Sequence, residues 1–252
     1  MLKFTSRTPF LSGNFPIPSE EMARSMKRLS AVTIFAVAMG YLEAAVVIYI
    51  REMISGSQIQ VFPIHFLGNA FALIEIGREL ATIIMLGVIG CLAGISRLQR
   101  WMYFVFSFAV WDLAYYMFLQ LLTGWPGSLL AYDVLFLIPV VWIGPVLAPV
   151  LVSLVLGTTS IIVIRICDYS ADVALGRVNL GLFVGGCVLI ILSFTRQIFH
   201  ILMTDGPKGI EGYSPKEFDW ILFSIGFTLM TFASVRFVTE VHQKMIQNKV
   251  DQ

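Results

Sequence analysis

Five ionisable side chains lie inside stretches of the sequence that are otherwise apolar. They are Glu43, Glu75, Arg78, Glu79 and Asp112. Charged groups at membrane depth are costly, so such residues usually mark a substrate or ion pathway, a proton relay or a paired helix contact. The presence of these five residues in apolar stretches therefore needs a chemical explanation.

The spacing of Glu75, Arg78 and Glu79 places all three on one side of a helix, because residues three and four apart are neighbours on a helix surface. Arg78 can pair with Glu75 along the helix, and its planar guanidinium can also serve a second carboxylate or a ligand anion. Glu79 would then need another partner.

Asp112 is followed by Tyr115 and Tyr116 at the same helical spacing. A phenol can donate a hydrogen bond to a carboxylate without adding charge, so we expect one of these tyrosines to hold Asp112. Trp111 beside it and Trp125 beyond it predict an aromatic rim where the helix reaches the outer interface.

Four carboxylates against Arg78 leave a formal charge of −3, or −2 if Arg196 reaches inward. An excess of negative charge is unfavourable in a medium of low dielectric constant. Either some of the carboxyls are therefore protonated, or water and a cationic partner balance their charge. The alternative is a structural polar network that ties three helices together. Because five such groups lie at related depths, we favour a functional site over a structural network. The predicted substrate- or proton-binding residues are Glu43, Glu75, Arg78, Glu79, Asp112, Tyr115 and Tyr116.

The composition indicates which kind of structural element carries these residues. Of the chain, 58% is hydrophobic and 13% is charged, and the mean hydropathy is +0.83. A soluble protein carries roughly twice that charged fraction. About 20 residues cross the hydrocarbon of a bilayer as a helix. The sequence therefore predicts an all-α, polytopic membrane helix bundle of about six transmembrane helices, from apolar runs at 29–50, 71–95, 101–122, 134–166, 178–199 and 220–238.

The fourth run differs from the others because it spans 33 residues and contains Pro139, Pro145 and Pro149. Proline removes a backbone donor and kinks or breaks a helix. We expect a proline-broken half-helix or re-entrant stretch over 133–144, followed by a span from 145 to 166. Asp133 would cap the N-terminus of the half-helix.

The lysines and arginines give the bundle a direction, since cytoplasmic loops are richer in them. With six spans and the N-terminus inside, 12 of the 17 fall in inner segments and four, Arg51 among them, in outer segments. The predicted division is a cytoplasmic arm (1–28), a transmembrane domain (29–238) and a cytoplasmic tail (239–252). The location is a cell membrane, the inner membrane in a bacterium. The outer loops at 51–69 and 200–219 would fold over the outer mouth of the bundle.

Two pairs of glycines have the small-xxx-small spacing that allows close helix contact, Gly90 with Gly94 and Gly181 with Gly185. They indicate helix packing and nothing more specific.

Several classes of function are excluded or disfavoured. No predicted span contains a histidine, so a b-type haem with histidine ligands is not expected. A net charge of +1 gives no reason to expect nucleic acid. The sequence contains no phosphate-binding glycine loop, no GxSxG and no HExxH motif. A carboxylate-only site for a hard cation stays open.

Three hypotheses follow. The leading one is a small transporter or permease component. The second is a membrane subunit of a larger complex, for example one that offers a quinol site to a redox partner. The third and weakest is a lipid-modifying enzyme that uses paired carboxyls as acid and base, so enzymatic activity is the least favoured reading. The expected surroundings are the lipid bilayer, with a homo-oligomer or partner subunits left open.

Overall fold

The computed structural model describes residues 19–55, 61–65, 68–168 and 176–250. Each of its six long helices is long and apolar enough to cross a membrane, so the predicted all-α bundle of six spans is confirmed and the chain is a multi-pass membrane protein. The helices are α1 (Ser19–Ser55), α2 (Asn69–Ala93), α3 (Arg97–Thr123), α4 (Leu147–Cys167), α5 (Arg177–Thr204) and α6 (Trp220–Val250).

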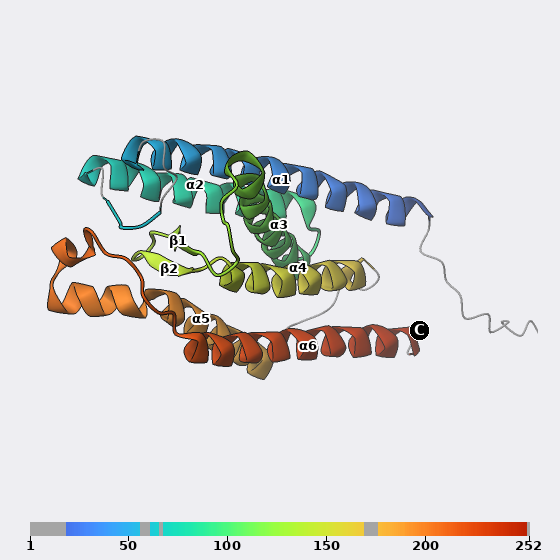
Figure 1. Ribbon diagram of the computed structural model, residues 1–252. Coiled ribbons are helices and arrows are strands. Elements are labelled where there is room, and N and C mark those ends of the chain that lie inside the picture. The colour runs from blue at the N-terminus through green and yellow to red at the C-terminus, as the bar shows by residue number, and fades with distance from the viewer. Residues whose placement is uncertain (1–18, 56–60, 66–67, 169–175, 251–252) are drawn as a thin grey trace, which may run out of the picture.

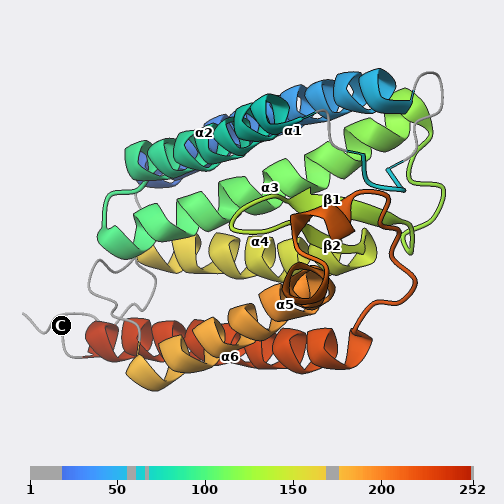
Figure 2. The ribbon, with the colours of Figure 1, turned by 90° about the vertical axis from the view of Figure 1, so that its left-hand side faces the viewer.

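The helices form three pairs. Helices α1 and α2 lie on one side of the molecule, α5 and α6 lie on the other, and α3 and α4 run between them (Figures 1 and 2). The beginning of α1 and the end of α6 lie at the same end of the bundle (Figure 1). We call this the inner end, following the prediction from the basic residues that it faces the cytoplasm.

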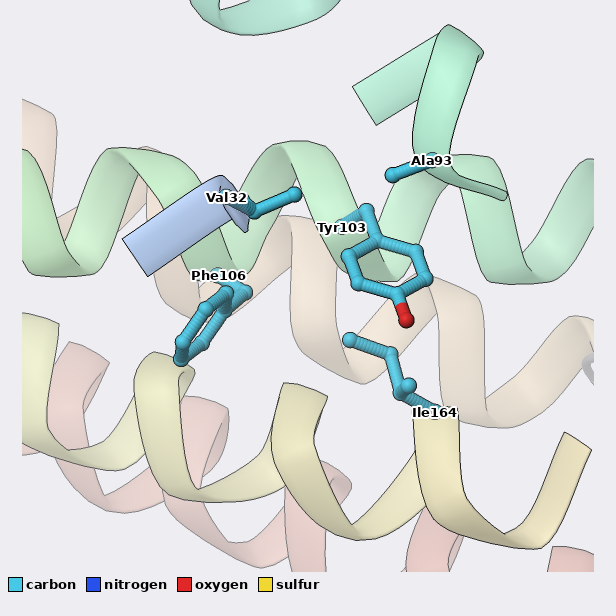
Figure 3. Close-up of a cluster of buried hydrophobic side chains, with 5 residues drawn as sticks. All are labelled: Val32, Ala93, Tyr103, Phe106 and Ile164. Atoms are coloured by element: carbon cyan, nitrogen blue, oxygen red, sulfur yellow. The ribbon is translucent and has the colours of Figure 1, made fainter. Parts of the chain in front are cut away.

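A cluster of buried side chains joins four helices near the inner end (Figure 3). Tyr103 and Phe106 of α3 meet Val32 of α1, Ala93 of α2 and Ile164 of α4, and none of the five is more than 9% exposed. Lipid tails are as apolar as these side chains, so close packing rather than exclusion of water stabilises the contact.

The glycine spacing on α2 marks a real helix contact. A Cβ on Gly90 would lie 2.7 Å from the backbone nitrogen of Phe104, and one on Gly94 would collide with the backbone of Arg100. The prediction of close packing is therefore confirmed for this pair.

On α5, the predicted glycine pair is not the one that faces a neighbouring helix. Nothing lies within 4 Å of a Cβ on Gly181 or Gly185, whereas one on Gly186 would lie 2.7 Å from the backbone nitrogen of Met230. On the facing helix, a Cβ on Gly226 would lie 2.8 Å from the carbonyl oxygen of Gly186. Helices α5 and α6 thus approach through this second pair of glycines.

The half-helix predicted over 133–144 is also wrong, because the segment forms an antiparallel hairpin of β1 (Tyr132–Phe136) and β2 (Trp142–Pro145). Valine, isoleucine, tyrosine, phenylalanine and tryptophan dominate the segment, and these residues favour strands. Pro139 lies between the strands and Pro145 ends β2, where neither interrupts a helix.

The hairpin lies between α2 and α5 (Figure 1). The described parts of the two outer loops pack over it: Ile64 and Ile210 join a buried cluster with Ile143 of β2. The loops also pair through their backbones, with the Ile64 N–H donating to the Tyr213 carbonyl at 2.9 Å. The prediction that the outer loops cover this end is confirmed for residues 61–65 and 207–213, while 56–60 and 66–67 lie outside the described residues.

Parts of the predicted arm and tail belong to the first and last helices. Residues 1–18 of the predicted arm lie outside the described part, and residues 19–28 already belong to α1. Helix α6 continues to Val250, so most of the predicted tail is helical. The division into arm, transmembrane domain and tail stays a prediction.

Candidate functional site

An arginine on α2 ties the first two helices together. The Nε of Arg78 donates to Glu75 at 2.8 Å, and its Nη1 donates to Glu43 on α1. The pairing along the helix and the second carboxylate were both anticipated from the spacing. Arg78 is thus occupied by two carboxylates and adds no net positive charge to the site.

Glu79 holds the hairpin. Its two carboxylate oxygens accept the backbone N–H of Leu137, at 2.9 and 3.1 Å, and the residue is 7% exposed. A hairpin of two strands leaves backbone groups unpaired, and at membrane depth each needs a protein partner. The partner that Glu79 was expected to need is therefore the backbone of the hairpin.

Asp112 is held by Ser153 of α4, whose hydroxyl donates to the carboxylate at 2.8 Å. The predicted hydrogen bond from Tyr115 or Tyr116 to Asp112 is not the one that forms. Helix α4 supplies the donor instead, because it packs along α3 and brings Ser153 to the carboxylate. Asp112 is 7% exposed and Ser153 is 1% exposed, so the pair is buried.

The tyrosines serve a different carboxylate. The Tyr115 hydroxyl donates to Asp133 at 3.3 Å, and the ring of Tyr116 packs edge-on against that of Tyr115 with centroids 4.8 Å apart. The predicted N-cap role of Asp133 is wrong, since the residue lies in β1 and no helix begins there. Its carboxylate accepts instead from the N–H of Val134 at 2.9 Å.

Arg51 is the residue that the sequence analysis missed. It was counted as an outer-loop charge, yet it lies at the end of α1, is 6% exposed, and donates to Asp133 at 2.7 Å. Its guanidinium also lies over the ring of Trp125, 4.2 Å from the centroid. The signal that could have found it is the apolar setting of Asp133, because a buried ionised carboxylate is costly and a nearby arginine can compensate it.

Arg196 does not join the group. It pairs with Asp219 at the end of the bundle, and its side chain is 71% exposed. The alternative in which Arg196 reduces the internal charge is therefore wrong.

The predicted residues surround a cavity of about 200 Å³ between the helix pairs. All of them except Glu75 line it, together with side chains from the hairpin, α4, α5 and α6. Within the described ranges, neither Glu79 nor Asp112 has a lysine or arginine within ion-pair distance. The cavity residues that the sequence predicted are Glu43, Arg78, Glu79, Asp112, Tyr115 and Tyr116.

A second cavity, also of about 200 Å³, adjoins the first toward the outer loops. Arg78, Glu79 and Tyr115 belong to both walls. Glu75 lines the second cavity, as does Arg51. The two spaces therefore meet where Glu79 holds the hairpin.

A polar cluster at the inner end lies outside the predicted site. Asp168, just after α4, accepts from Ser25 and from Arg28 of α1, the latter at 3.2 Å, and from Gln99 of α3 at 2.8 Å. The sequence analysis counted Arg28 only toward the direction of the bundle. The cluster fixes the ends of three helices opposite the outer pair of Arg51 and Asp133.

The carboxylate-only cation site left open by the sequence has no geometric support. In the part of the chain that the structure describes, no three histidine, cysteine, aspartate or glutamate side chains converge as metal ligands would.

The chain matches no protein-family model, no curated protein and no solved structure. What its own residues establish is an integral membrane protein whose six apolar helices enclose an acidic, aromatic cavity near the outer end.

Proposed function

We propose that the protein is a small transporter or permease component whose substrate binds in the cavity around Glu79 and Asp112. The observation that carries the proposal is that two buried carboxyls line one cavity and that neither forms an ion pair with a lysine or arginine among the described residues. A purely structural network would pair them, as Arg78 pairs Glu43 and Glu75. Groups left in this state can exchange a proton or a cation when a substrate arrives.

The arrangement of the cavities supports passage rather than simple storage. The second cavity adjoins the first on the side of the outer loops, which gives a route from the outer end toward Asp112. The hairpin lies beside the junction of the two cavities, and Glu79 binds its backbone. Non-helical backbone at membrane depth is tolerated where it is buried in protein or lines a wet cavity.

Ion pairs at both ends of the bundle support the same proposal. Arg51 and Asp133 lie on the outer side of the cavity, and Arg28 and Asp168 lie at the inner end. The arginines are 23 positions apart on α1, or about 35 Å along the helix. That distance is close to the hydrocarbon thickness of a bilayer. Alternating access would require each cluster to loosen in turn.

Uptake by the purified protein in liposomes tests the proposal. The vesicles are given an inward or outward pH gradient and a defined mixture of amines, amino acids, carboxylates, sugars and nucleosides, and the trapped solutes are measured by mass spectrometry. We expect at least one solute to accumulate above the level in protein-free liposomes. A folded, monodisperse protein that accumulates none of them in either gradient contradicts the proposal.

A further inference from the structure

The lining of the cavity around Asp112 combines carboxyls with aromatic rings. Glu79 of α2 and Asp112 of α3 supply carboxyls. The aromatic part is a run of rings: Phe136 of β1 lies 5.4 Å from Trp142 of β2, which stacks at 6.2 Å on Phe194 of α5. A ligand that fits this lining has a charged or polar end and an apolar body.

The charged residues that line the cavity determine which charge the polar end of a ligand should carry. Arg78 already serves Glu43 and Glu75, so its positive charge is neutralised within the protein. Glu79 and Asp112 are left with neutral donors only, a backbone N–H and a serine hydroxyl. A cationic group in the cavity would share the lining with two carboxyls and with aromatic rings, whose faces attract cations as well.

The indole groups of the wall provide an independent observation. The Nε1 atoms of Trp111 and Trp142 are buried and have no hydrogen-bond partner in the described part of the chain, and both residues line the cavity. Trp111 is 5% exposed. A buried N–H without an acceptor is costly, so these two donors favour a ligand that also carries an acceptor such as a hydroxyl or carbonyl oxygen.

The size of the cavity limits the ligand. An apolar cavity of about 150 Å³ holds benzene, so about 200 Å³ is suited to a molecule of roughly ten non-hydrogen atoms. On these grounds we infer that the substrate is a small organic cation, an ammonium group on an aromatic or apolar body that also carries an acceptor oxygen. This inference rests on the proposed function because it assigns the substrate class of the same cavity. Entry of the cation would release a proton from Glu79 or Asp112 wherever that carboxyl is protonated.

Three probes that differ mainly in charge test the inference on the detergent-solubilised protein. Benzyltrimethylammonium is a permanent cation, neopentylbenzene is its neutral isostere, and 3-phenylpropanoate is an anion of similar size. We expect calorimetry or equilibrium dialysis to show at least tenfold tighter binding of the cation than of either other probe. Equal binding of the neutral isostere, preference for the anion, or no binding of the cation would overturn the inference.

Two cavity variants and one control locate the binding. Asp112→Asn and Glu79→Gln keep the size of the side chain and should each weaken binding of benzyltrimethylammonium about tenfold. Asp219→Asn removes a carboxylate that pairs with the exposed Arg196 outside the cavity, and it should leave binding unchanged. Equal weakening in all three variants would contradict a site at Asp112. The comparison of the probes on the unaltered protein needs no variant to fold.

The uptake experiment separates this inference from the proposed function. If liposomes accumulate only anions or sugars, transport stands and the organic cation is wrong. If benzyltrimethylammonium binds but no solute from the mixture accumulates, the cation site stands and transport is wrong.

Discussion

Arg51 at the end of α1 and Asp133 at the start of the hairpin form a buried ion pair, with 2.7 Å between Nη2 and Oδ1. Their side chains are 7% and 1% exposed. The pair joins the first span to the hairpin, and Tyr115 and Trp125 complete its surroundings. It therefore links the outer end of the bundle to the wall of the proposed site.

Removal of Arg51 should destabilise the protein more than removal of both partners. Arg51→Met leaves the Asp133 carboxylate buried without its cation, which costs about 3–5 kcal/mol in comparable buried pairs. The double variant Arg51→Met with Asp133→Asn should recover part of that loss. Thermal unfolding in detergent measures both. A single variant as stable as the double variant would show that the pair is not coupled.

Glu79 should combine a structural and a functional role that two substitutions can separate. Glu79→Gln keeps an oxygen to accept the Leu137 N–H, whereas Glu79→Ala leaves that buried N–H unsatisfied at a cost of about 1–3 kcal/mol. Hydrogen exchange at Leu137 should stay slow in the glutamine variant and become fast in the alanine variant. Equal exchange in the two variants contradicts the role of Glu79 as the anchor of the hairpin.

Neighbouring glycines on α5 should respond to alanine with opposite signs. A Cβ on Gly186 would lie 2.7 Å from the backbone of Met230, so Gly186→Ala must push α5 and α6 apart, at a cost of about 1–3 kcal/mol. Gly185 has no atom within 4 Å of an added Cβ, so Gly185→Ala should be neutral or stabilise the helix by up to about 1 kcal/mol. Melting temperatures of the two variants compare them directly. Similar losses would contradict the close crossing of α5 and α6 at Gly186.

The orientation can be tested by labelling single cysteines in a background in which Cys91, Cys167 and Cys187 are replaced. A cysteine at Lys208, on the exposed outer loop, should react with a membrane-impermeant maleimide on intact cells. A cysteine at Gln243, near the end of α6, should react only after the cells are permeabilised. The reverse pattern would place both termini outside.

The sequence predicted the helices well because a lipid-facing helix carries its own signal in length and hydropathy. The group of Arg78 with Glu43 and Glu75 was predictable for a related reason, since helical spacing and the scarcity of charge left few partners. The hairpin was harder, because Pro139 and Pro145 exclude a regular helix without saying which extended structure replaces it. Two contacts near the hairpin were therefore also predicted wrongly: one of Tyr115 and Tyr116 was expected to hold Asp112, and Arg51 was placed in a loop.

Contacts between helices distant in sequence were the least predictable part of the site. Ser153 is one of two serines in an apolar run, and only the packing of α4 on α3 brings it to Asp112. The spacing favoured Gly185, which follows Gly181 by four residues, but the rotation of α5 turns Gly186 toward α6 instead.

The most direct test of the proposed site is the pH dependence of solute uptake by Asp112→Asn and Glu79→Gln in liposomes, measured beside the unaltered protein and Asp219→Asn. If the two cavity carboxyls exchange a proton or bind the cation, each cavity variant should lose at least tenfold in uptake and lose its response to the pH gradient, while Asp219→Asn transports normally. Uptake and pH dependence in both cavity variants equal to those of the unaltered protein would contradict the account.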